Sequence, residues 1–362
     1  MFFIKKLTVL VTGAKAPGFV SIVRSLKLSK KYKFKIIGTD WKKSLGASYF
    51  ADEDFILPSN DDPEFPEALL DTIKKEKVDV LLPIRTNDLL PICQRLKEFR
   101  EEGTEPALPT TNPSLLNIAL DKYKLLEYTQ NIIELETPVF YKAKTLEELK
   151  KRVEELGYPN NPVCIKPTRS NGSRGFRILD NQIDRKSLFF NEKPNHVYST
   201  LDRVIEDIGE SFPPLIVMEF LPGKEYTLDV LCRKGITFAI LPRFRKAMRG
   251  GITTEGVLQR DRNYDEMCLF SEKIIEGFGF SYNIGIQMKE DRKGKVRLLE
   301  VNPRLQGTTI INTASGVNIP EKMVEMALGI FDYNFKPQIK WNTELERVYF
   351  EIFNYEGTVW HQ

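Results

Sequence analysis

Short apolar runs alternate with segments of helical spacing over the first hundred residues. Continuous apolar runs bounded by turn residues predict buried strands, and apolar residues three or four positions apart predict the helices that cover them. The predicted strands are 7–11, 34–38, 55–57 and 78–83, and the predicted helices are 20–28, 66–75 and 89–100. This alternation predicts a parallel sheet with right-handed crossovers. The turn-rich segment 101–113 is the first predicted boundary.

The pattern changes after residue 113, where strands no longer alternate regularly with helices. Apolar spacing predicts helices at 115–130, 146–156, 264–278 and 323–328, the second with Thr145 as its cap. Predicted strands are 163–166, 176–179, 216–220, 225–232, 237–241, 284–289 and 295–301. A flexible polar loop joins the first two of these strands into a hairpin, and the next three predict an antiparallel sheet.

The composition and charge argue against several classes of function. With 41% hydrophobic and 28% charged residues the chain is typical of globular proteins, and its net charge of +3 is too balanced to indicate nucleic acid or a membrane surface as partner. The N-terminal apolar stretch is broken by Lys5 and Lys6, and no other run is long enough to span a membrane. Four widely spaced cysteines favour a reducing cytoplasm. The only histidines, His196 and His361, argue against a multi-histidine metal site and against Ser-His catalysis.

A turn at residues 12–18 follows the first predicted strand, where a dinucleotide-binding turn would lie. Its glycine spacing differs from GxGxxG, and Pro17 lacks the amide donor that a phosphate would need. Asp40 ends the second strand, where an acid could bind ribose, but it also suits a cap. We favour a tight structural turn, and an NAD-dependent oxidoreductase stays a distant alternative.

A second candidate is the loop from Lys166 to Gly175, which is rich in glycine and serine. Glycines let backbone amides approach phosphate oxygens, and Lys166 and Arg174 would neutralise their charge. The spacing is not that of a Walker A loop, and a flexible surface hairpin explains the segment equally well. A third candidate, 218–225, runs from an apolar strand into a Pro-Gly turn. Its backbone could hold an adenine edge with Glu225 at the ribose, or it could form a plain hairpin.

The fourth candidate is a group of oxygen-bearing side chains on two neighbouring strands. Glu300 and Asn302 are two apart and therefore share one face of their strand, and Gln287 lies on the strand before it. Three such side chains suit a hard cation such as Mg²⁺, which also takes phosphate oxygens and water. Arg304 follows at the same spacing, where it could hold a phosphoryl group. Alone, the segment could equally be a strand that ends in a turn.

In this order and spacing, the segments 163–175, 284–289 and 298–304 resemble the ATP-grasp superfamily. The resemblance is closest to the ATP-binding half of the carbamoyl phosphate synthetase large subunit and its stand-alone relatives, and it covers roughly residues 1–330. It implies an α/β and α+β fold, with a Rossmann-like domain at 1–105 that usually does not bind NAD. A two-subdomain ATP-grasp domain would span 106–330 with a mobile lid at about 160–220, and the tail 331–362 would pack on it.

The resemblance also implies roles for individual residues. The residues that it places around ATP are Lys122 and Lys166 at the phosphates, Ser173 and Gly175 in the lid loop, the backbone of Glu219 and Leu221 at adenine, and Glu225 at ribose. Gln287, Glu300 and Asn302 would be the metal ligands, for two Mg²⁺ ions with Mn²⁺ as a substitute. Arg304 would steady the γ-phosphate and the acyl phosphate. Arg249, in the basic segment 243–254, would bind the substrate carboxylate, unless that segment is only a solvated edge.

We therefore expect a cytoplasmic ATP-dependent carboxylate–amine ligase that forms an acyl phosphate and releases ADP and phosphate. The chain has one ATP-binding half where the carbamoyl phosphate synthetase large subunit has two, and no glutaminase Cys/His pair is visible, which favours a stand-alone ligase. The alternatives are an ATP-dependent carboxylase or carbamoyl-phosphate-forming enzyme, and a non-catalytic nucleotide sensor. The partners would be a small carboxylate and an amine, with residues 85–88 as candidate lining, and a homodimer is compatible with the resemblance.

Overall fold

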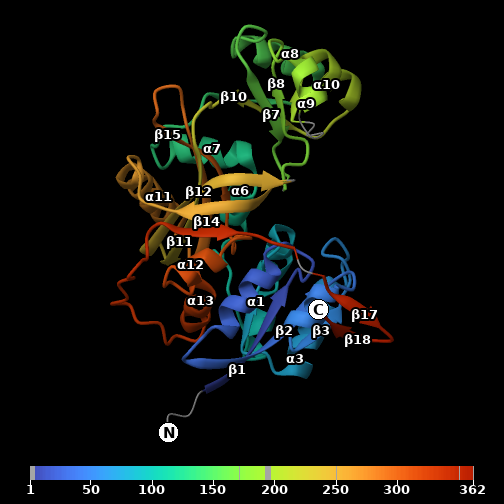
Figure 1. The fold of residues 1–362 in the computed structure, drawn as a ribbon, viewed down its shortest axis with the longest axis vertical. Coiled ribbons are helices and arrows are strands. Elements are labelled where there is room, and N and C mark those ends of the chain that lie inside the picture. Colours follow the sequence, from blue (N-terminus) through green and yellow to red (C-terminus); the bar gives the residue numbers. More distant parts are fainter. Residues whose placement is uncertain (1–4, 171, 192–196, 250, 350, 362) are drawn as a thin grey trace.

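The computed structural model describes residues 5–170, 172–191, 197–249, 251–349 and 351–361. Three sheets follow one another along the long axis of the molecule (Figure 1). The sheet of the N-terminal part lies at one end, a six-stranded sheet lies in the middle, and a smaller five-stranded sheet lies at the other end. Among the described residues, no helix combines the length and the apolar character needed to cross a membrane.

The first sheet has five parallel strands in the order β3-β2-β1-β4-β5. The strands are β1 (Lys5–Thr12), β2 (Tyr32–Asp40), β3 (Glu53–Ile56), β4 (Val80–Leu82) and β5 (Glu105–Pro106). The helices are α1 (Phe19–Lys27), α2 (Leu45–Phe50), α3 (Phe65–Glu76), the 3-10 helix η1 (Thr86–Asp88), α4 (Leu89–Gln94) and α5 (Leu96–Glu101). Residues 9–11 of β1 are all fully buried, since helices cover both faces of the sheet. The predicted parallel sheet is confirmed.

Two details of this first part differ from the sequence-based prediction. The helix expected at 89–100 is divided into α4 and α5 at Arg95. The strand β5 lies inside the segment 101–113, which the sequence pattern assigned to turns. Since β5 has only two residues and contains Pro106, it carries no apolar run that could have revealed it.

The long helix expected at 115–130 is also two helices, α6 (Pro113–Ala119) and α7 (Lys122–Asn131). Asp121 starts the second helix, because its side chain accepts hydrogen bonds from the amides of Tyr123 and Lys124 at 3.1 Å. The division places Lys122 in the first turn of α7, where its amide donates to the carbonyl of Thr168 at 2.8 Å. The break therefore brings Lys122 next to the loop of residues 166–175, the glycine loop.

The second sheet has the order β6-β10-β7-β8-β9. Its strands are β6 (Phe140–Ala143), β7 (Val163–Pro167), β8 (Arg177–Leu179), β9 (Tyr198–Ser199) and β10 (Leu215–Glu219), and its helices are α8 (Leu146–Glu155), α9 (Arg185–Asn191) and α10 (Leu201–Ile208). The predicted hairpin of β7 and β8 and the Thr145 cap of α8 are confirmed. Placing 216–220 in one sheet with 225–232 was wrong, because β10 pairs with β6 and β7 instead. Apolar alternation shows that a segment is a strand but not which strand lies beside it.

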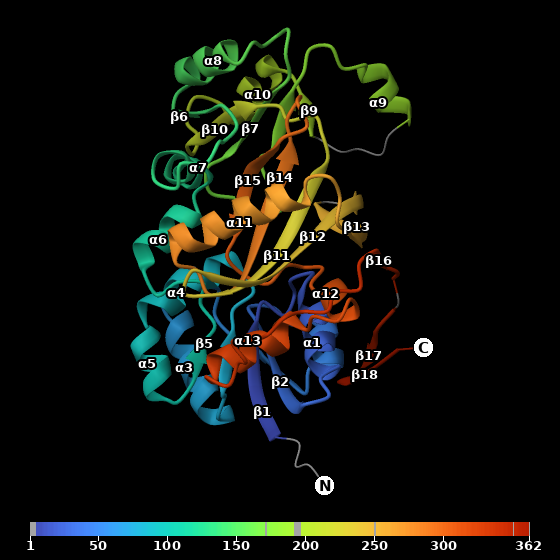
Figure 2. The same cartoon turned by 90° about the vertical axis from the view of Figure 1, so that its left-hand side faces the viewer.

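The third sheet is antiparallel, in the order β15-β14-β11-β12-β13-β16. Its strands are β11 (Glu225–Arg233), β12 (Ile236–Arg249), β13 (Ile252–Leu258), β14 (Tyr282–Glu290), β15 (Val296–Asn302) and β16 (Thr343–Glu346), and its helices are α11 (Tyr264–Phe278), α12 (Ile310–Ala314) and α13 (Ile319–Ala327). The helix α11 packs on this sheet (Figure 2). Side chains of β1, α1, β12 and α13 form one continuous apolar core, so the first and third sheets are packed together.

The C-terminal tail contacts two parts of the molecule. Strand β16 pairs with β13, which adds the tail to the third sheet. Farther on, the hairpin of β17 (Phe353–Tyr355) and β18 (Thr358–Trp360) lies near α2, where a ring nitrogen of His361 and the hydroxyl of Tyr49 are 2.9 Å apart. The tail therefore packs on the third sheet and also reaches the N-terminal part. The domain boundaries at 105 and 330 stay predictions.

Candidate active site

The candidate metal ligands lie where β14 and β15 pair. Gln287 is directly opposite Glu300, and Asn302 is opposite Gly285. Directly paired residues of antiparallel strands project to the same face, so the three side chains share one face as the spacing predicted. Gly285 is required here, because a Cβ at this position would lie 1.9 Å from the side-chain amide nitrogen of Gln306.

The carboxylate of Glu300 is surrounded by donors and positive charges. Its Oε1 accepts a hydrogen bond from Asn302 at 2.8 Å, and its Oε2 lies 3.9 Å from the ammonium of Lys122. Burial alone would raise the pKa of Glu300, but the charges of Lys122 and Lys166 outweigh it, and the net pKa is lowered. The carboxylate therefore stays ionised in the absence of any ligand.

Lys122 and Lys166 come from different elements and converge on this carboxylate. Both residues are buried, and burial lowers the pKa of each ammonium group, partly offset by the charge of Glu300. Nζ of Lys122 donates to the carbonyl of Ser170 at 2.6 Å, and Nζ of Lys166 donates to the carbonyl of Leu299 at 3.4 Å. Two buried cations beside one carboxylate leave the site with an excess of positive charge.

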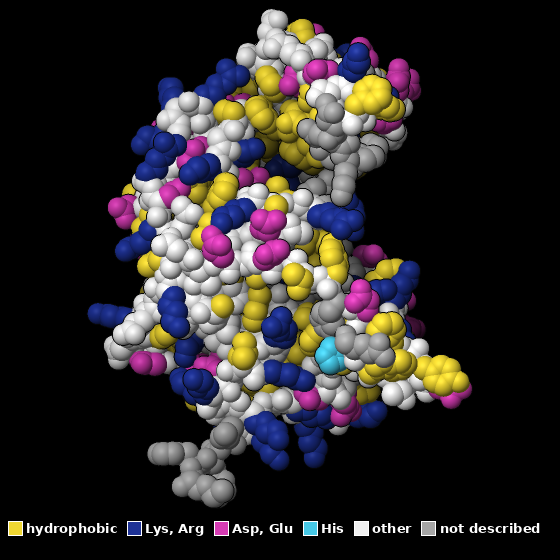
Figure 3. Space-filling model, in the orientation of Figure 1, with side chains coloured by type: hydrophobic (Ala, Val, Ile, Leu, Met, Phe, Trp, Pro, Cys, Tyr) yellow, Lys and Arg dark blue, Asp and Glu magenta, His cyan; other side chains and the backbone are white. Residues whose placement is uncertain are grey.

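The glycine loop after β7 closes over this region. Gly172, Ser173 and Gly175 all have positive φ angles, and a Cβ at Gly175 would lie 2.7 Å from the ring of Pro167. The loop tip touches the turn between β12 and β13, since a Cβ at Gly251 would lie 3.0 Å from Oγ of Ser173. Asn171, within the predicted phosphate loop, lies outside the described residues. Figure 3 shows a hollow on this side of the molecule, between the part built on the second sheet and the part built on the third.

The candidate adenine and ribose residues follow at the junction of β10 and β11. The amide of Glu219 donates to the carbonyl of Val139 at 3.0 Å, and its side chain accepts from the amide of Val139 at 2.9 Å. Leu221 is buried. The carboxylate of Glu225 accepts a hydrogen bond from Arg245 at 2.8 Å, so it would bind a ligand while still paired with that arginine.

Arg304 lies just beyond the metal-ligand strand and is buried at its guanidinium. The group donates to Oγ1 of Thr86 at 3.1 Å, to the carbonyl of Leu305 at 2.9 Å and to Asn302 at 3.4 Å. Burial lowers the pKa of Arg304, and the charges of Glu300 and Asp229 act in the opposite direction. Thr86 opens η1, in the part of the chain built on the first sheet, so the N-terminal part contacts Arg304 directly.

Arg249 is not part of the cluster around Glu300. It is exposed at the end of β12, where it donates to the hydroxyl of Tyr349 at 3.0 Å and lies 5.8 Å from the centre of that ring. Gly250, which follows it, lies outside the described residues. Gly251, two positions after Arg249, lies close to Ser173 of the glycine loop.

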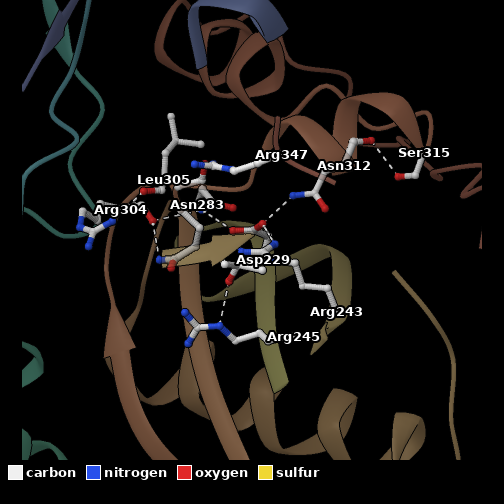
Figure 4. A network of polar contacts seen from close by, with 12 residues as sticks. Asp229, Arg243, Arg245, Asn283, Arg304, Leu305, Asn312, Ser315 and Arg347 are labelled. Atoms are coloured by element: carbon white, nitrogen blue, oxygen red, sulfur yellow. Dashed lines mark hydrogen bonds and ion pairs between the residues drawn. The ribbon is translucent and has the colours of Figure 1, made fainter. Parts of the chain in front are cut away.

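A buried polar network below the site was not recognised in the sequence. Asp229, fully buried in β11, is ion-paired with Arg243 and accepts hydrogen bonds from Asn312 at 2.6 Å and Asn283 at 3.2 Å (Figure 4). Asn283 also donates to the backbone carbonyl of Arg304 at 3.2 Å. The signal was present, because an aspartate inside the apolar run of β11 must find buried partners.

Arg347 of the tail was missed for a different reason. Its guanidinium donates to the carbonyl of Gly307 and to Oγ of Ser21, the latter at 3.4 Å, so it joins the loop after Arg304 to the N-terminal part. Burial lowers the pKa of Arg347, and the nearby charge of Arg243 lowers it further. The tail sequence contains no pattern that marks this residue.

The turn at 12–18 has the structure of a tight connection. Asp40 accepts hydrogen bonds from the amides of Lys15 at 2.9 Å and Trp41 at 2.8 Å. The predicted helix cap was wrong, because the N-cap residues of α1 and α2 are Gly18 and Ser44. The side chain of Arg85 lies across Gly13, where an added Cβ would be 2.6 Å from its Cγ. Asp40 and the turn are thus engaged within the protein, and the geometry gives no support to a dinucleotide site.

Two family models match this chain, one at each end of the arrangement described above. One is described as the PylC-like N-terminal domain and matches residues 9–107. The other is described as an ATP-grasp domain in the biosynthetic pathway with the Ter operon and matches residues 211–348. By the model that matches residues 211–348, the chain is similar to ATP-grasp proteins. The resemblance inferred from the segments 163–175, 284–289 and 298–304 is confirmed, and so is the fold class.

The named relatives of this chain have low sequence identity to it. The formate-dependent phosphoribosylglycinamide formyltransferase of Bacteroides fragilis is 23% identical over 266 residues, which cover 70% of this chain and 61% of that protein. The carbamoyl phosphate synthase large chain of Methanobrevibacter smithii is 23% identical over 282 residues, covering 74% of this chain and 25% of that protein. The chain thus spans less than two thirds of the length of these relatives.

Solved structures of low identity share the fold. The biotin carboxylase domain of the 2-oxoglutarate carboxylase of Hydrogenobacter thermophilus, a dimer in complex with MgADP, ADP and bicarbonate, has a TM-score of 0.67 and 17% identity. The match covers 93% of this chain and 73% of that domain. At this identity the comparison establishes the ATP-grasp fold and nothing about the substrate.

Proposed function

We propose that this ATP-grasp protein is an ATP-dependent carboxylate–amine ligase that acts through an acyl phosphate. The observation that carries the proposal is the convergence of Lys122 and Lys166 on Glu300. Two cations, a carboxylate and the nearby Arg304 suit a ligand that carries several negative charges together with a divalent ion. MgATP is such a ligand.

The donor groups at β14 and β15 fit Mg²⁺. Among the described residues, no group of three or more His, Cys, Asp or Glu side chains could hold a metal, so protein charges alone would not retain the ion. Glu300 with the amide oxygens of Gln287 and Asn302 suits an ion that takes its remaining ligands from phosphate and water. Bound Mg²⁺ neutralises charge on the phosphates. We propose two such ions per site, with Mn²⁺ as a substitute.

The nucleotide would lie between the second and third sheets. Because the amide of Glu219 is engaged by Val139, Glu219 would offer adenine its carbonyl group, and Leu221 would offer its amide. Glu225 would accept hydrogen bonds from the ribose hydroxyls while Arg245 holds its carboxylate in place. Lys122, Lys166 and the amides of the loop at Ser173 and Gly175 would contact the phosphates.

The reaction would proceed in two displacements. An oxygen of the substrate carboxylate attacks the γ-phosphorus of ATP and ADP leaves, which forms the acyl phosphate. The amine nitrogen then attacks the acyl carbon, phosphate leaves, and the amine gives up a proton to solvent. The first step needs alignment and charge neutralisation more than a nucleophilic side chain, and Lys122, Lys166 and Arg304 supply positive charge. Arg249 would bind the substrate carboxylate.

The test is a screen of amino acids and small carboxylates, alone and with amines, for stimulated release of ADP from MgATP. The expected result is ADP release that requires both a carboxylate and an amine, with a condensation product detected by mass spectrometry. A protein that binds MgATP but releases no ADP with any combination would be the non-catalytic sensor, and the ligase proposal would be wrong.

One comparison favours a second candidate, an ATP-dependent carboxylase or carbamoyl-phosphate-forming enzyme. The carboxylase domain of similar fold is described with MgADP and bicarbonate. Bicarbonate is itself a carboxylate, so the same phosphoryl transfer would activate it. ADP release that is stimulated by bicarbonate without any amino acid would favour this candidate.

We also propose a homodimer, on the basis of one comparison. The carboxylase domain of similar fold is described as a dimer. Sedimentation equilibrium of the full chain would give twice the mass of 41.8 kDa if the proposal holds, and the single mass if it does not.

A further inference from the structure

The guanidinium of Arg304 is held by a residue that precedes it by more than two hundred positions. Its Nε donates to Oγ1 of Thr86 at 3.1 Å. Its other hydrogen bonds go to Leu305 and Asn302, which are its own neighbours in the chain. Of these three partners, Thr86 alone comes from another part of the chain.

Thr86 lies in a fixed turn. It opens η1, directly after β4, at the carboxyl end of the first sheet. Asp88, at the end of this 3-10 helix, is fully buried and accepts hydrogen bonds from Thr12 at 2.6 Å and from Arg85 at 3.3 Å. These contacts tie the turn to β1, so the hydroxyl of Thr86 has a rigid support.

The loop after Arg304 packs equally closely on the N-terminal part. A Cβ at Gly18 would lie 2.9 Å from the Cα of Gly307, so only glycine allows this approach. One loop, residues 302–307, makes both contacts with the N-terminal part. Its Gly307 approaches Gly18, and its Arg304 bonds to Thr86. The first sheet therefore sets both the position of the loop and the direction of its arginine.

We propose that Thr86 is a positioning residue that orients the guanidinium of Arg304 toward the γ-phosphate of bound ATP. With Nε held by Thr86, the terminal nitrogens keep N–H donors for phosphate oxygens in the planar, forked geometry of guanidinium. An arginine side chain without this contact would sample other rotamers and meet the phosphate less often. The inference rests on the proposed function in one respect, the place of Arg304 beside the γ-phosphate.

The test compares T86V, which keeps the shape of threonine but loses the hydroxyl, with T86S, which keeps the hydroxyl. The measurements are kcat and KM for ADP release, and the affinities for MgADP and for the magnesium complex of the non-hydrolysable analogue AMP-PNP. T72V is the matched control, because the hydroxyl of Thr72 donates to the carbonyl of Ala68 within α3, away from the candidate site.

We expect T86V to lower kcat about tenfold, the order of magnitude for a lost hydrogen bond to a charged group. Its affinity for AMP-PNP should fall several-fold while its affinity for ADP, which has no γ-phosphate, is unchanged. T86S should stay within about twofold of wild type, since one hydroxyl replaces the other, and T72V should match wild type. If T86V does not fold, T86A replaces it in the same measurements.

Three results would overturn the proposal. They are a T86V protein with wild-type kcat and AMP-PNP affinity, an equal loss of affinity for ADP and AMP-PNP, and a T86S protein as impaired as T86V. If wild-type protein releases no ADP with any substrate, the ligase function fails independently. The difference between AMP-PNP and ADP binding then still decides the role of Thr86.

Discussion

The ammonium of Lys122 lies 3.9 Å from the carboxylate of Glu300, although one residue opens a helix and the other lies near the end of a strand of the third sheet. Lys166 adds a second positive charge from the second sheet. Because these charges lower the pKa of Glu300 against the effect of burial, the carboxylate is ionised and ready to bind a cation. The arrangement brings residues of α7, the second sheet and the third sheet together at one carboxylate.

Replacing this carboxylate by its amide tests the proposed metal site. We expect E300Q to reduce ADP release by about a hundredfold or more, because the carboxylate that we propose binds Mg²⁺ is replaced by a neutral amide. The fold should be retained, since the side chain keeps its size and is 26% exposed. E154Q, at an exposed position on α8, is the control and should behave as wild type. ADP release by E300Q at the wild-type rate would contradict the metal assignment.

Lys166 gives a prediction on the dependence of stability on pH. Its pKa is lowered in the folded protein, so the folded state binds the lysine proton less tightly than the unfolded chain does. The protonated lysine therefore costs stability at neutral pH, and this cost disappears as pH rises through the lowered pKa toward the value of the unfolded chain. Methionine carries no such charge. We expect K166M to unfold at a higher temperature than wild type at pH 7, with a smaller difference at pH 9.5.

The same variant should lose ADP release, because it lacks the ammonium group that we propose contacts the phosphates of ATP. Thermal unfolding at the two pH values and an ADP assay at pH 7 measure both effects on one protein preparation. An unfolding temperature for K166M below that of wild type at pH 7 would show that the buried lysine stabilises the ligand-free fold, contrary to the prediction.

Local patterns in the sequence predicted most elements, and their failures have physical causes. Residues 7–11 and 264–278 carry clear periodicities and form β1 and α11. Asp121 divides a continuous helical pattern, because a capping side chain can end one helix and start another without disturbing the apolar spacing. The sheet to which β10 belongs depends on contacts with β6 and β7, which lie far away in the chain.

In the candidate site, too, some features could be predicted from the sequence and others could not. The common face of Glu300 and Asn302 followed from the period of a strand, Lys166 followed from its place before the glycine- and serine-rich loop, and Lys122 followed from the family resemblance. The contacts of Thr86 with Arg304 and of Arg347 with Gly307 arise only when the first and third sheets pack together. No local pattern encodes such packing. The roles of Lys122, Arg249 and the other site residues stay predictions.

The buried pair of Asp229 and Arg243 gives a prediction on stability. We expect D229N to lower the free energy of unfolding by about 3–5 kcal/mol, because it leaves the guanidinium of Arg243 buried without an opposite charge. Urea denaturation of the ligand-free protein measures the change. The double variant D229N/R243M should lose less stability than D229N alone, since the unpaired guanidinium at position 243 is removed as well.

A surface pair provides the control for this measurement. Nη1 of Arg152 lies 2.7 Å from Oε2 of Glu155 on α8, and each side chain is about one third exposed to solvent. We expect E155Q to change the free energy of unfolding by less than about 1 kcal/mol. A loss for D229N as small as that of E155Q would show that Arg243 finds other partners.

The hydrogen bond between Arg249 and Tyr349 leads to the last prediction. The hydroxyl of Tyr349 accepts from Arg249 at 3.0 Å, and it thereby engages a guanidinium that we propose binds the substrate carboxylate. A carboxylate forms a stronger, charge-assisted bond with a guanidinium, so it should displace the neutral hydroxyl. We expect Y349F to lower the KM for the carboxylate substrate a few-fold, since the competing hydroxyl is gone. R249A should raise the same KM at least tenfold and leave the KM for ATP unchanged. Y355F alters another exposed tyrosine of the tail and should change neither constant. If Y349F instead raises the KM for the carboxylate as R249A does, the tail orients Arg249 for the substrate and does not compete with it.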